Sequence, residues 1–230
     1  MRLFSFNDFL FILAATRWTI VLSLLAFALG GLLGCVIAIL RISKFAPLRL
    51  AAAGYVQLFQ GTPLLMQLFL IYYGLSLFGW RLDAWTAVTI AYTIYAAAFL
   101  GDIWRGCIQA VPNEQWEASR ALALGYLHQL FLVIMPQAVR IAIPPTVGFL
   151  VQLVKATAVA SIIGFVELTR AGQLMTNATF QPMIVYPIVA TLYFALCWPL
   201  SLWAQYLEKQ LRVENVMGNF WSIGGAFVIR

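Results

Sequence analysis

The sequence carries little charge and almost no histidine. Asp, Glu, Lys and Arg together make up 10% of its 230 residues, and His128 is the single histidine. Because soluble domains carry about 25% charged residues, this composition excludes an ordinary cytosolic enzyme and a disordered chain. A single histidine also excludes a zinc site built on paired histidines.

Cysteine is scarce, and the short catalytic motifs are missing. The three cysteines, Cys35, Cys107 and Cys197, lie far apart and are odd in number, so they predict neither a disulfide framework nor a metal site. Neither the phosphate-binding pattern G-x-x-x-x-G-K-[ST] nor the nucleophile elbow G-x-S-x-G occurs. We therefore expect no catalytic residues, no metal and no cofactor bound by this chain, and the chain is not predicted to be an enzyme.

Apolar residues are what the sequence has in abundance. They make up 63% of the chain, and the mean hydropathy is +0.90. A fold of this size cannot enclose so much apolar surface in one core, so its outward surface must face lipid. The basic excess, 14 Lys and Arg against 8 Asp and Glu, is spread singly between apolar runs. This pattern indicates membrane topology and excludes a nucleic-acid-binding domain.

Runs of bilayer length divide the chain. A helix needs about 20 mostly apolar residues to cross a hydrocarbon core about 30 Å thick. We therefore expect an all-α integral membrane protein, with residues 1–230 forming a single domain of about five spanning helices. Pro144 and Pro145 are expected to interrupt a helix near the fourth span. The expected spans are residues 18–40, 55–79, 84–101, 136–154 and 183–206.

The basic residues are distributed unevenly over the loops that join these spans. Nine lie on one side of the expected membrane and five on the other. The positive-inside rule then places the N-terminus outside and the C-terminus in the cytoplasm. Asp8 interrupts any apolar signal segment, so no cleavable signal peptide is expected. The same orientation puts a loop of residues 105–135 in the cytoplasm.

This cytoplasmic loop contains a short, polar helix. Pro112 and Asn113 predict its start, with Asn113 as the N-cap, and Glu114 and Glu117 suit the positive end of the helix dipole. The expected helix, residues 114–124, is too short and too charged to span a bilayer. From these features alone, a helix lying on the membrane surface stays an alternative to a helix that binds a partner protein.

The same loop resembles a known motif. Glu117-Ala118-Ser119, followed by Pro136, resembles the EAA loop of ATP-binding-cassette importer permeases, which reads E-A-A, three residues, G, nine residues and I-x-L-P. Ala123 occupies the family's glycine in that pattern, and Gly125 stands where a serine is usual. Because glycine adopts positive φ freely, we expect the bend after the helix to shift to Gly125.

Two further segments narrow the resemblance to the polar-amino-acid branch of that family. Residues 59–67 resemble its R-G-T-P-L-L segment, with Gln60 in place of arginine, and residues 153–157 resemble its L-K-D-T segment, with Ala156 in place of the acid. The resemblance covers roughly residues 18–211. By resemblance, the residues that couple the chain to an ATPase are Glu117, Ala118, Ser119, Arg120, Ala123, Gly125 and Pro136.

The resemblance implies a membrane machine of several subunits. The chain would be a permease subunit with the type I importer (MetI-like) fold in the bacterial cytoplasmic membrane. A second permease subunit, identical or homologous, would complete the pathway. Two cytoplasmic ATP-binding subunits would use ATP and Mg²⁺, and an extracytoplasmic binding protein would deliver the substrate. That substrate would be a polar amino acid or a derivative such as an opine.

Buried polar residues supply candidates for the substrate pathway. An ionisable side chain at membrane depth is costly unless it faces a partner or a water-filled cavity. We expect Glu167 to lie along the pathway, with the neutral residues Gln67, Thr157 and Thr62 as hydrogen-bonding companions. The alternative is a structural salt bridge from Glu167 to Arg170 or to Lys155.

Other interpretations stay open at this point. Gly30 and Gly34 form a G-x-x-x-G pattern that permits close helix packing, either within the subunit or between two copies. An ion-coupled secondary transporter would also be helical, but it should carry internal repeats and ion-coupling carboxylates. A structural membrane scaffold would account for the apolar spans and not for the ordered loop motifs.

Overall fold

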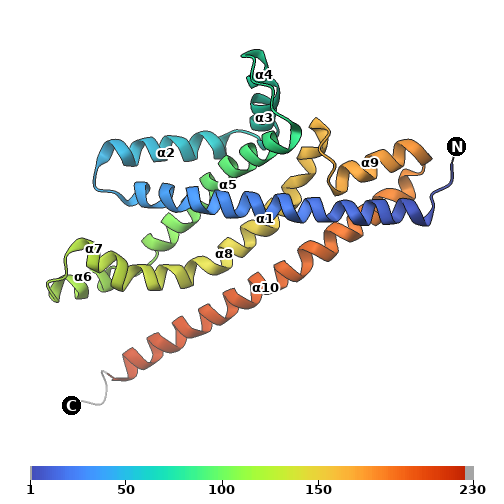
Figure 1. Cartoon of the computed structure of the whole chain (residues 1–230). Coiled ribbons are helices and arrows are strands. Elements are labelled where there is room, and N and C mark those ends of the chain that lie inside the picture. Colours follow the sequence, from blue (N-terminus) through green and yellow to red (C-terminus); the bar gives the residue numbers. More distant parts are fainter. Residues whose placement is uncertain (1, 226–230) are drawn as a thin grey trace.

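The computed structural model describes the backbone of residues 2–225 and the side chains of residues 2–211. Within that part of the chain every regular element is a helix (Figure 1). The elements are α1 (Phe6–Ile42), α2 (Ala46–Gly61), α3 (Leu64–Phe69), the π-helical η1 (Leu70–Gly74), α4 (Leu75–Leu77), α5 (Ala84–Gln109), α6 (Asn113–Ala121), α7 (Tyr126–His128), the π-helical η2 (Gln129–Ile134), α8 (Met135–Ala156), the 3₁₀-helical η3 (Thr157–Ile163), α9 (Leu168–Thr179) and α10 (Pro182–Gly225).

Four of these segments are long and apolar enough to cross a membrane unaided. They are Phe6–Ile42, Ala84–Gln109, Tyr126–Ile163 and Pro182–Leu211. Each contains one of the expected spans, but the first helix begins twelve residues before residue 18 and the helical segment around the fourth begins ten residues before residue 136.

The second expected span, residues 55–79, is not one helix. Ala46–Gly61 and Leu64–Leu77 meet at an angle of 102°, and the pair forms at most a broken span. The break lies at Thr62 and Pro63, where Thr62 has an extended backbone (φ −112°, ψ 141°). A residue that precedes proline is driven out of the helical region by the proline ring, so the straight helix that hydropathy suggests cannot form here.

Close packing of α1 against α5 forms the centre of the bundle. A Cβ added at Gly30 would lie 2.5 Å from the Cβ of Ala96, and one added at Gly101 would lie 2.8 Å from the Cβ of Ile37. Gly34 is similarly confined, 3.1 Å from the Cβ of Leu100. The G-x-x-x-G pattern therefore serves packing within the subunit, because the partner of Gly30 and Gly34 is α5 of the same chain.

The other side of α5 packs against α8. The hydroxyl of Tyr92 donates to the carbonyl of Ala156 at 2.7 Å, and the Trp104 Nε1–H donates to the Thr146 hydroxyl at 2.9 Å. Each bond gives a polar side chain of α5 a partner on α8. Such partners are needed in the hydrocarbon core, because no water is available there to form the hydrogen bond. The main buried cluster lies between α1, α3, α5, α8 and η3.

The expected interruption at Pro144 and Pro145 does not occur. Helix α8 is continuous from Met135 to Ala156 with both prolines inside it. The two residues line an open groove of about 560 Å³ between α8 and α10, together with Gly148. Because neither proline has an N–H, α8 lacks two backbone hydrogen bonds in this turn, and it nevertheless continues to Ala156.

The bundle has two distinct ends. Helices α6 and α7 lie at one end, next to the C-terminal end of α1, and the oblique helix α10 runs back toward that end (Figure 1). The N-terminus and α9 lie at the opposite end, where the backbone N–H of Phe4 donates to Oε1 of Gln181 at 3.1 Å.

Candidate coupling helix and buried polar cluster

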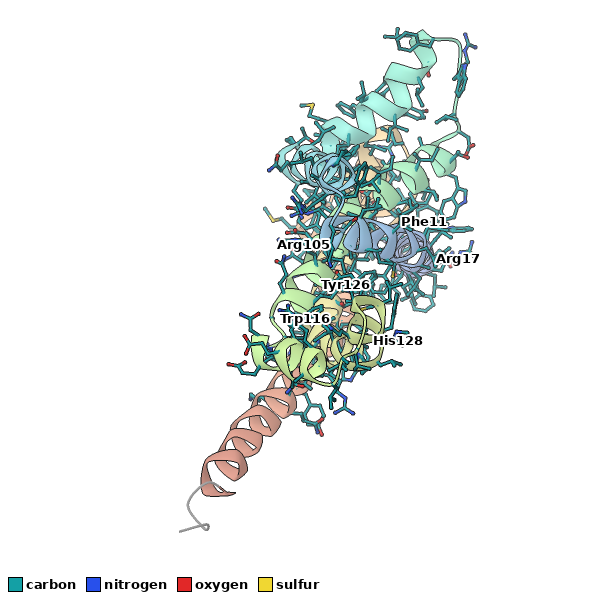
Figure 2. All side chains as sticks on the ribbon, turned by 90° about the vertical axis from the view of Figure 1, so that its left-hand side faces the viewer. Phe11, Arg17, Arg105, Trp116, Tyr126 and His128 are labelled. Atoms are coloured by element: carbon teal, nitrogen blue, oxygen red, sulfur yellow. The ribbon has the colours of Figure 1, made fainter. Side chains whose placement is uncertain are left out.

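The short helix of the polar loop is α6. It runs from Asn113 to Ala121 and projects from the end of the bundle that faces the viewer in Figure 2. The cap position is occupied by Pro112, which is extended (φ −54°, ψ 142°) and makes no side-chain cap. The prediction that Asn113 is the N-cap is therefore wrong, because Asn113 is already the first helical residue.

The end of α6 corrects the expected position of the bend. The Ala123 N–H donates to the Arg120 carbonyl at 2.8 Å and the Leu124 N–H donates to the Ser119 carbonyl at 3.3 Å. This pair of bonds is a Schellman motif, which requires a left-handed residue at the position of Ala123. Ala123 has φ +55°, whereas Gly125 is ordinary extended backbone with φ −66°. The bend thus stays at the family's glycine position, and the expected shift to Gly125 is wrong.

The residues of the EAA-like segment divide between two faces of α6. Glu117, Ala118 and Arg120 are exposed, and no ion pair joins Glu117 to Arg120 among the side chains that the structure describes. Ser119 is only 2% exposed, and its hydroxyl donates to the Trp116 carbonyl at 2.9 Å. Ser119 therefore packs within this subunit, and the face available to a partner consists of Glu117, Ala118 and Arg120.

Aromatic stacking fixes α6 to the rest of the bundle. The rings of Trp116 and Tyr126 stack with centroids 6.1 Å apart, and both are labelled in Figure 2. They pack against a buried apolar cluster that includes Ile108 of α5 and Ile134 of η2. The Nε2 of Gln137 in α8 also donates to Oε1 of Gln115 in α6 at 3.3 Å. The short helix thus contacts α5, η2 and α8.

Pro136 follows the π-helical turn η2. It lies in the first turn of α8, and the N–H of Met135 donates to the carbonyl of Leu130, five residues earlier. Proline has no N–H to offer to Leu132, so the preceding turn is free to widen. Gln129, the first residue of η2, links this turn to the end of the α6 loop, because its Nε2 donates to the carbonyl of Leu124. Pro136 therefore sits where the loop enters a spanning helix, as the motif spacing indicates.

Glu167 has no exposed surface and caps α9. Its Oε1 accepts from the Arg170 N–H at 2.7 Å, and its Oε2 accepts from the Thr169 N–H at 2.9 Å and from the Tyr193 hydroxyl at 2.7 Å. The alternative role, a salt bridge to Arg170 or to Lys155, is absent from the described side chains, and the Arg170 guanidinium instead donates to Gln173 at 3.1 Å.

Burial and hydrogen bonding shift the pKa of the Glu167 carboxyl in opposite directions. This residue lies between the candidate spans Tyr126–Ile163 and Pro182–Leu211. Burial raises the pKa of its carboxyl, whereas the hydrogen bonds from Thr169, Tyr193 and Arg170 lower the pKa. The sequence does not predict that Glu167 is the N-cap of α9, because glutamate is not among the residues that dominate N-cap positions.

Gln67 and Thr62 form a separate polar group at the α2–α3 bend. The Nε2 of Gln67 donates to the Phe59 carbonyl at 2.8 Å and to both oxygens of Thr62 at 3.0 Å. Thr157 is fully buried, and its hydroxyl donates to the Val154 carbonyl at 2.7 Å. The structure thus does not bring the four pathway candidates into one hydrogen-bonded group, and their role in transport stays a prediction.

Known proteins resemble this chain along most of its length. Residues 30–213 match the family described as binding-protein-dependent transport system inner membrane component. A probable glutamine ABC transporter permease of Bacillus subtilis (strain 168) is 35% identical over 206 residues, which cover 90% of this chain and 95% of the relative.

Solved structures show the same helical arrangement. The crystal structure of an amino acid ABC transporter with histidines superposes with a TM-score of 0.83 at 34% identity, covering 87% of this chain and 94% of that one. An inward-facing structure of the MetNI methionine ABC transporter superposes with a TM-score of 0.74 at 18% identity, covering 90% of this chain and 99% of that one, which shows a shared fold.

Proposed function

Because this chain belongs to the family of binding-protein-dependent transport system inner membrane components, we propose that it forms part of the pathway by which a polar amino acid or a close derivative enters a bacterial cell. It is a multi-pass permease subunit of an ATP-binding-cassette importer with the type I importer fold, and it is not itself an enzyme. The comparisons give no support to an ion-coupled transporter or to a structural scaffold. The substrate class follows from the glutamine named for the relative and the amino acid named for the superposed transporter.

The proposed mechanism rests on one observation, which is that one face of α6 is exposed. A signal from a soluble partner reaches a membrane domain through physical contact. In our proposal the exposed Glu117, Ala118 and Arg120 contact an ATP-binding subunit that uses ATP and Mg²⁺. Because Trp116 stacks on Tyr126 and packs with the ends of α5 and η2, a displacement of α6 would carry those ends with it.

The remaining parts of the machine follow from this assignment. A second permease subunit, identical or homologous, would complete the pathway, and two ATP-binding subunits would dock on the two copies of α6. A binding protein would deliver substrate at the opposite end of the bundle. In this orientation α6 and the C-terminus lie in the cytoplasm and the N-terminus outside. The arrangement in Figure 1 supports it, since α10 runs toward the α6 end.

The substrate pathway is proposed to include Glu167, Thr157, Gln67 and Thr62. This proposal is supported by two features. All four residues are polar, and Glu167, Thr157 and Gln67 are buried. Glu167 links two elements, because its carboxylate accepts from the backbone of α9 and from Tyr193 of α10. A substrate that disturbs this carboxylate would disturb the contact between α9 and α10.

Reconstituted uptake tests the proposed function. The complex is purified with its partners and placed in proteoliposomes, and uptake of radiolabelled amino acids is measured. We expect uptake to require both internal ATP and the binding protein. Uptake that follows an imposed ion gradient without ATP would overturn the proposal.

A further inference from the structure

Two basic pockets share the Trp116–Tyr126 stack as part of their walls. One, of about 330 Å³, is lined by Arg41 and Arg49 and by polar groups that include Gln109. The other, of about 510 Å³, is lined by Lys44, Arg120 and polar groups that include Gln129. Asn113, Trp116 and Tyr126 line both. No carboxylate belongs to either lining, so both pockets are electropositive.

Nearby acidic groups do not cancel this charge. Asp102 lies 3.4 Å from Arg41 and 3.0 Å from Arg105, so one carboxylate is shared by two guanidinium groups. Lys44 and Arg49 are exposed, and neither is paired with a carboxylate among the side chains that the structure describes. Lys44 lies over the Tyr126 ring, with its Nζ 4.5 Å from the centroid. The pockets therefore keep a net positive charge and suit an anion.

An apolar groove begins at the same place. It has a volume of about 520 Å³ and runs between α1, α5, α8 and α10. Ile108 lines both this groove and the Arg41–Arg49 pocket, so the two lie next to each other. Thr146 is the one hydroxyl in the groove lining, and it already accepts from Trp104. The rest of the lining is almost wholly apolar, so the groove suits a hydrocarbon chain.

The residues around the pockets have the pattern of a membrane interface. Phe45, Leu48 and Leu50 are 60%, 45% and 67% exposed, and they alternate with the basic residues Lys44 and Arg49. Exposed apolar residues interleaved with Lys and Arg bind at the boundary between headgroups and acyl chains. Basic pockets between spanning helices on the cytoplasmic side recognise anionic headgroups.

We propose that this corner binds one anionic phospholipid of the cytoplasmic leaflet. Its anionic headgroup lies at Tyr126, where the two pockets meet, within reach of Lys44 and Arg49, and an acyl chain lies in the neighbouring groove along α1 and α8. The proposal rests on the proposed function, which places the α6 end at the cytoplasmic surface. Because the pockets share the wall that anchors α6, the bound lipid would brace the coupling helix and make coupled uptake depend on anionic lipid.

Lipid retention tests the site directly. The complex, purified with its ATP-binding subunits, is equilibrated with mixed phosphatidylglycerol and phosphatidylcholine, and native mass spectrometry counts the lipids that stay bound. We expect the unmodified complex to retain phosphatidylglycerol preferentially. The double variant Lys44→Gln/Arg49→Gln should bind phosphatidylglycerol roughly thirtyfold more weakly, since two basic contacts are lost. Ala142→Phe, which fills the groove without changing charge, should also weaken retention.

Matched controls separate the possible outcomes. Arg81→Gln, at an exposed basic residue outside the pockets, and Ala51→Phe, at an exposed alanine of α2, should retain lipid as the unmodified chain does. Equal retention by the pocket variants would overturn the lipid site. Displacement of phosphatidylglycerol by millimolar inorganic phosphate would also overturn it, because the pockets would then hold a soluble anion.

The proposed function is checked in the same preparation. Absence of ATP- and binding-protein-dependent uptake in every lipid contradicts that function. Normal uptake with no lipid preference contradicts the lipid site alone.

Discussion

Ala123 is held in a backbone conformation that alanine rarely adopts. Its φ of +55° is imposed by the two hydrogen bonds that end α6. A left-handed residue with a Cβ is strained by about 1–2 kcal/mol relative to the right-handed form. The resemblance located this position through the family's glycine. It did not predict that alanine takes the same conformation, because hydrogen bonding at the helix end and not side-chain identity decides which residue turns left-handed.

Replacing Ala123 by glycine should therefore stabilise the loop. We expect Ala123→Gly to raise the free energy of unfolding by about 0.5–1 kcal/mol, after the greater freedom of glycine in the unfolded chain offsets part of the relief. Thermal unfolding of the purified subunit measures the effect. Ala121→Gly, inside the last turn of α6, is the matched control and should destabilise by about 0.5–1 kcal/mol. Equal effects of the two substitutions would contradict the assigned strain.

Glu167→Gln tests the pathway role at the same scale. The amide keeps one acceptor but presents N–H groups to donors, so it cannot accept from Thr169, Arg170 and Tyr193 together. We expect slower substrate uptake with intact subunit assembly, measured by transport assay and by co-elution in size-exclusion chromatography. Tyr193→Phe removes only the hydroxyl contact and is expected to have a smaller effect on uptake. An unchanged rate and substrate dependence in Glu167→Gln would remove this residue from the pathway.

At the scale of single helices, substitutions in α6 test the proposed contact with the ATP-binding subunit most directly. Ala118→Trp or Glu117→Lys should leave the permease inserted but release the ATP-binding subunit or uncouple ATP hydrolysis from uptake, because both residues lie on the exposed face of α6. Co-purification of the ATP-binding subunit and uptake per ATP hydrolysed are the measurements. Ala51→Trp, on the exposed surface of α2, is the control for a bulky surface substitution and should be neutral. Normal coupling in both α6 variants would return this helix to a role at the membrane surface.

Hydropathy located the long apolar helices more accurately than it located the residues at which they begin and end. Helix α1 starts at Phe6 because Asp8 and Ser5 cap it, which a search for charge-free runs overlooks. The break before Pro63 was readable from the residue pattern, since proline restricts Thr62. The continuity of α8 through Pro144 and Pro145 was not, because prolines inside a helix usually kink or end it, and local sequence does not show that α8 continues.

For the whole molecule, orientation is the property to be measured. In a background with Cys35, Cys107 and Cys197 replaced, single cysteines are introduced at residues 81–83 and at residues 44–46. A membrane-impermeant maleimide added to intact cells should label the first group and not the second, because the basic residues around the α1–α2 corner favour the cytoplasm. Labelling of the second group in intact cells, with protection of the first, would invert the topology.

The glycine contacts between α1 and α5 restrict how this subunit can change shape. A long side chain that bridges two helices can change rotamer and let them slide. Gly30, Gly34 and Gly101 are instead faced by Cβ atoms of the other helix, and a Cβ atom is fixed to its backbone. Helices α1 and α5 must therefore move as one rigid body when α6 is displaced. The relative motion of a transport cycle falls instead to the open boundary between α8 and α10, where the groove at Pro144 and Pro145 leaves space for a hinge.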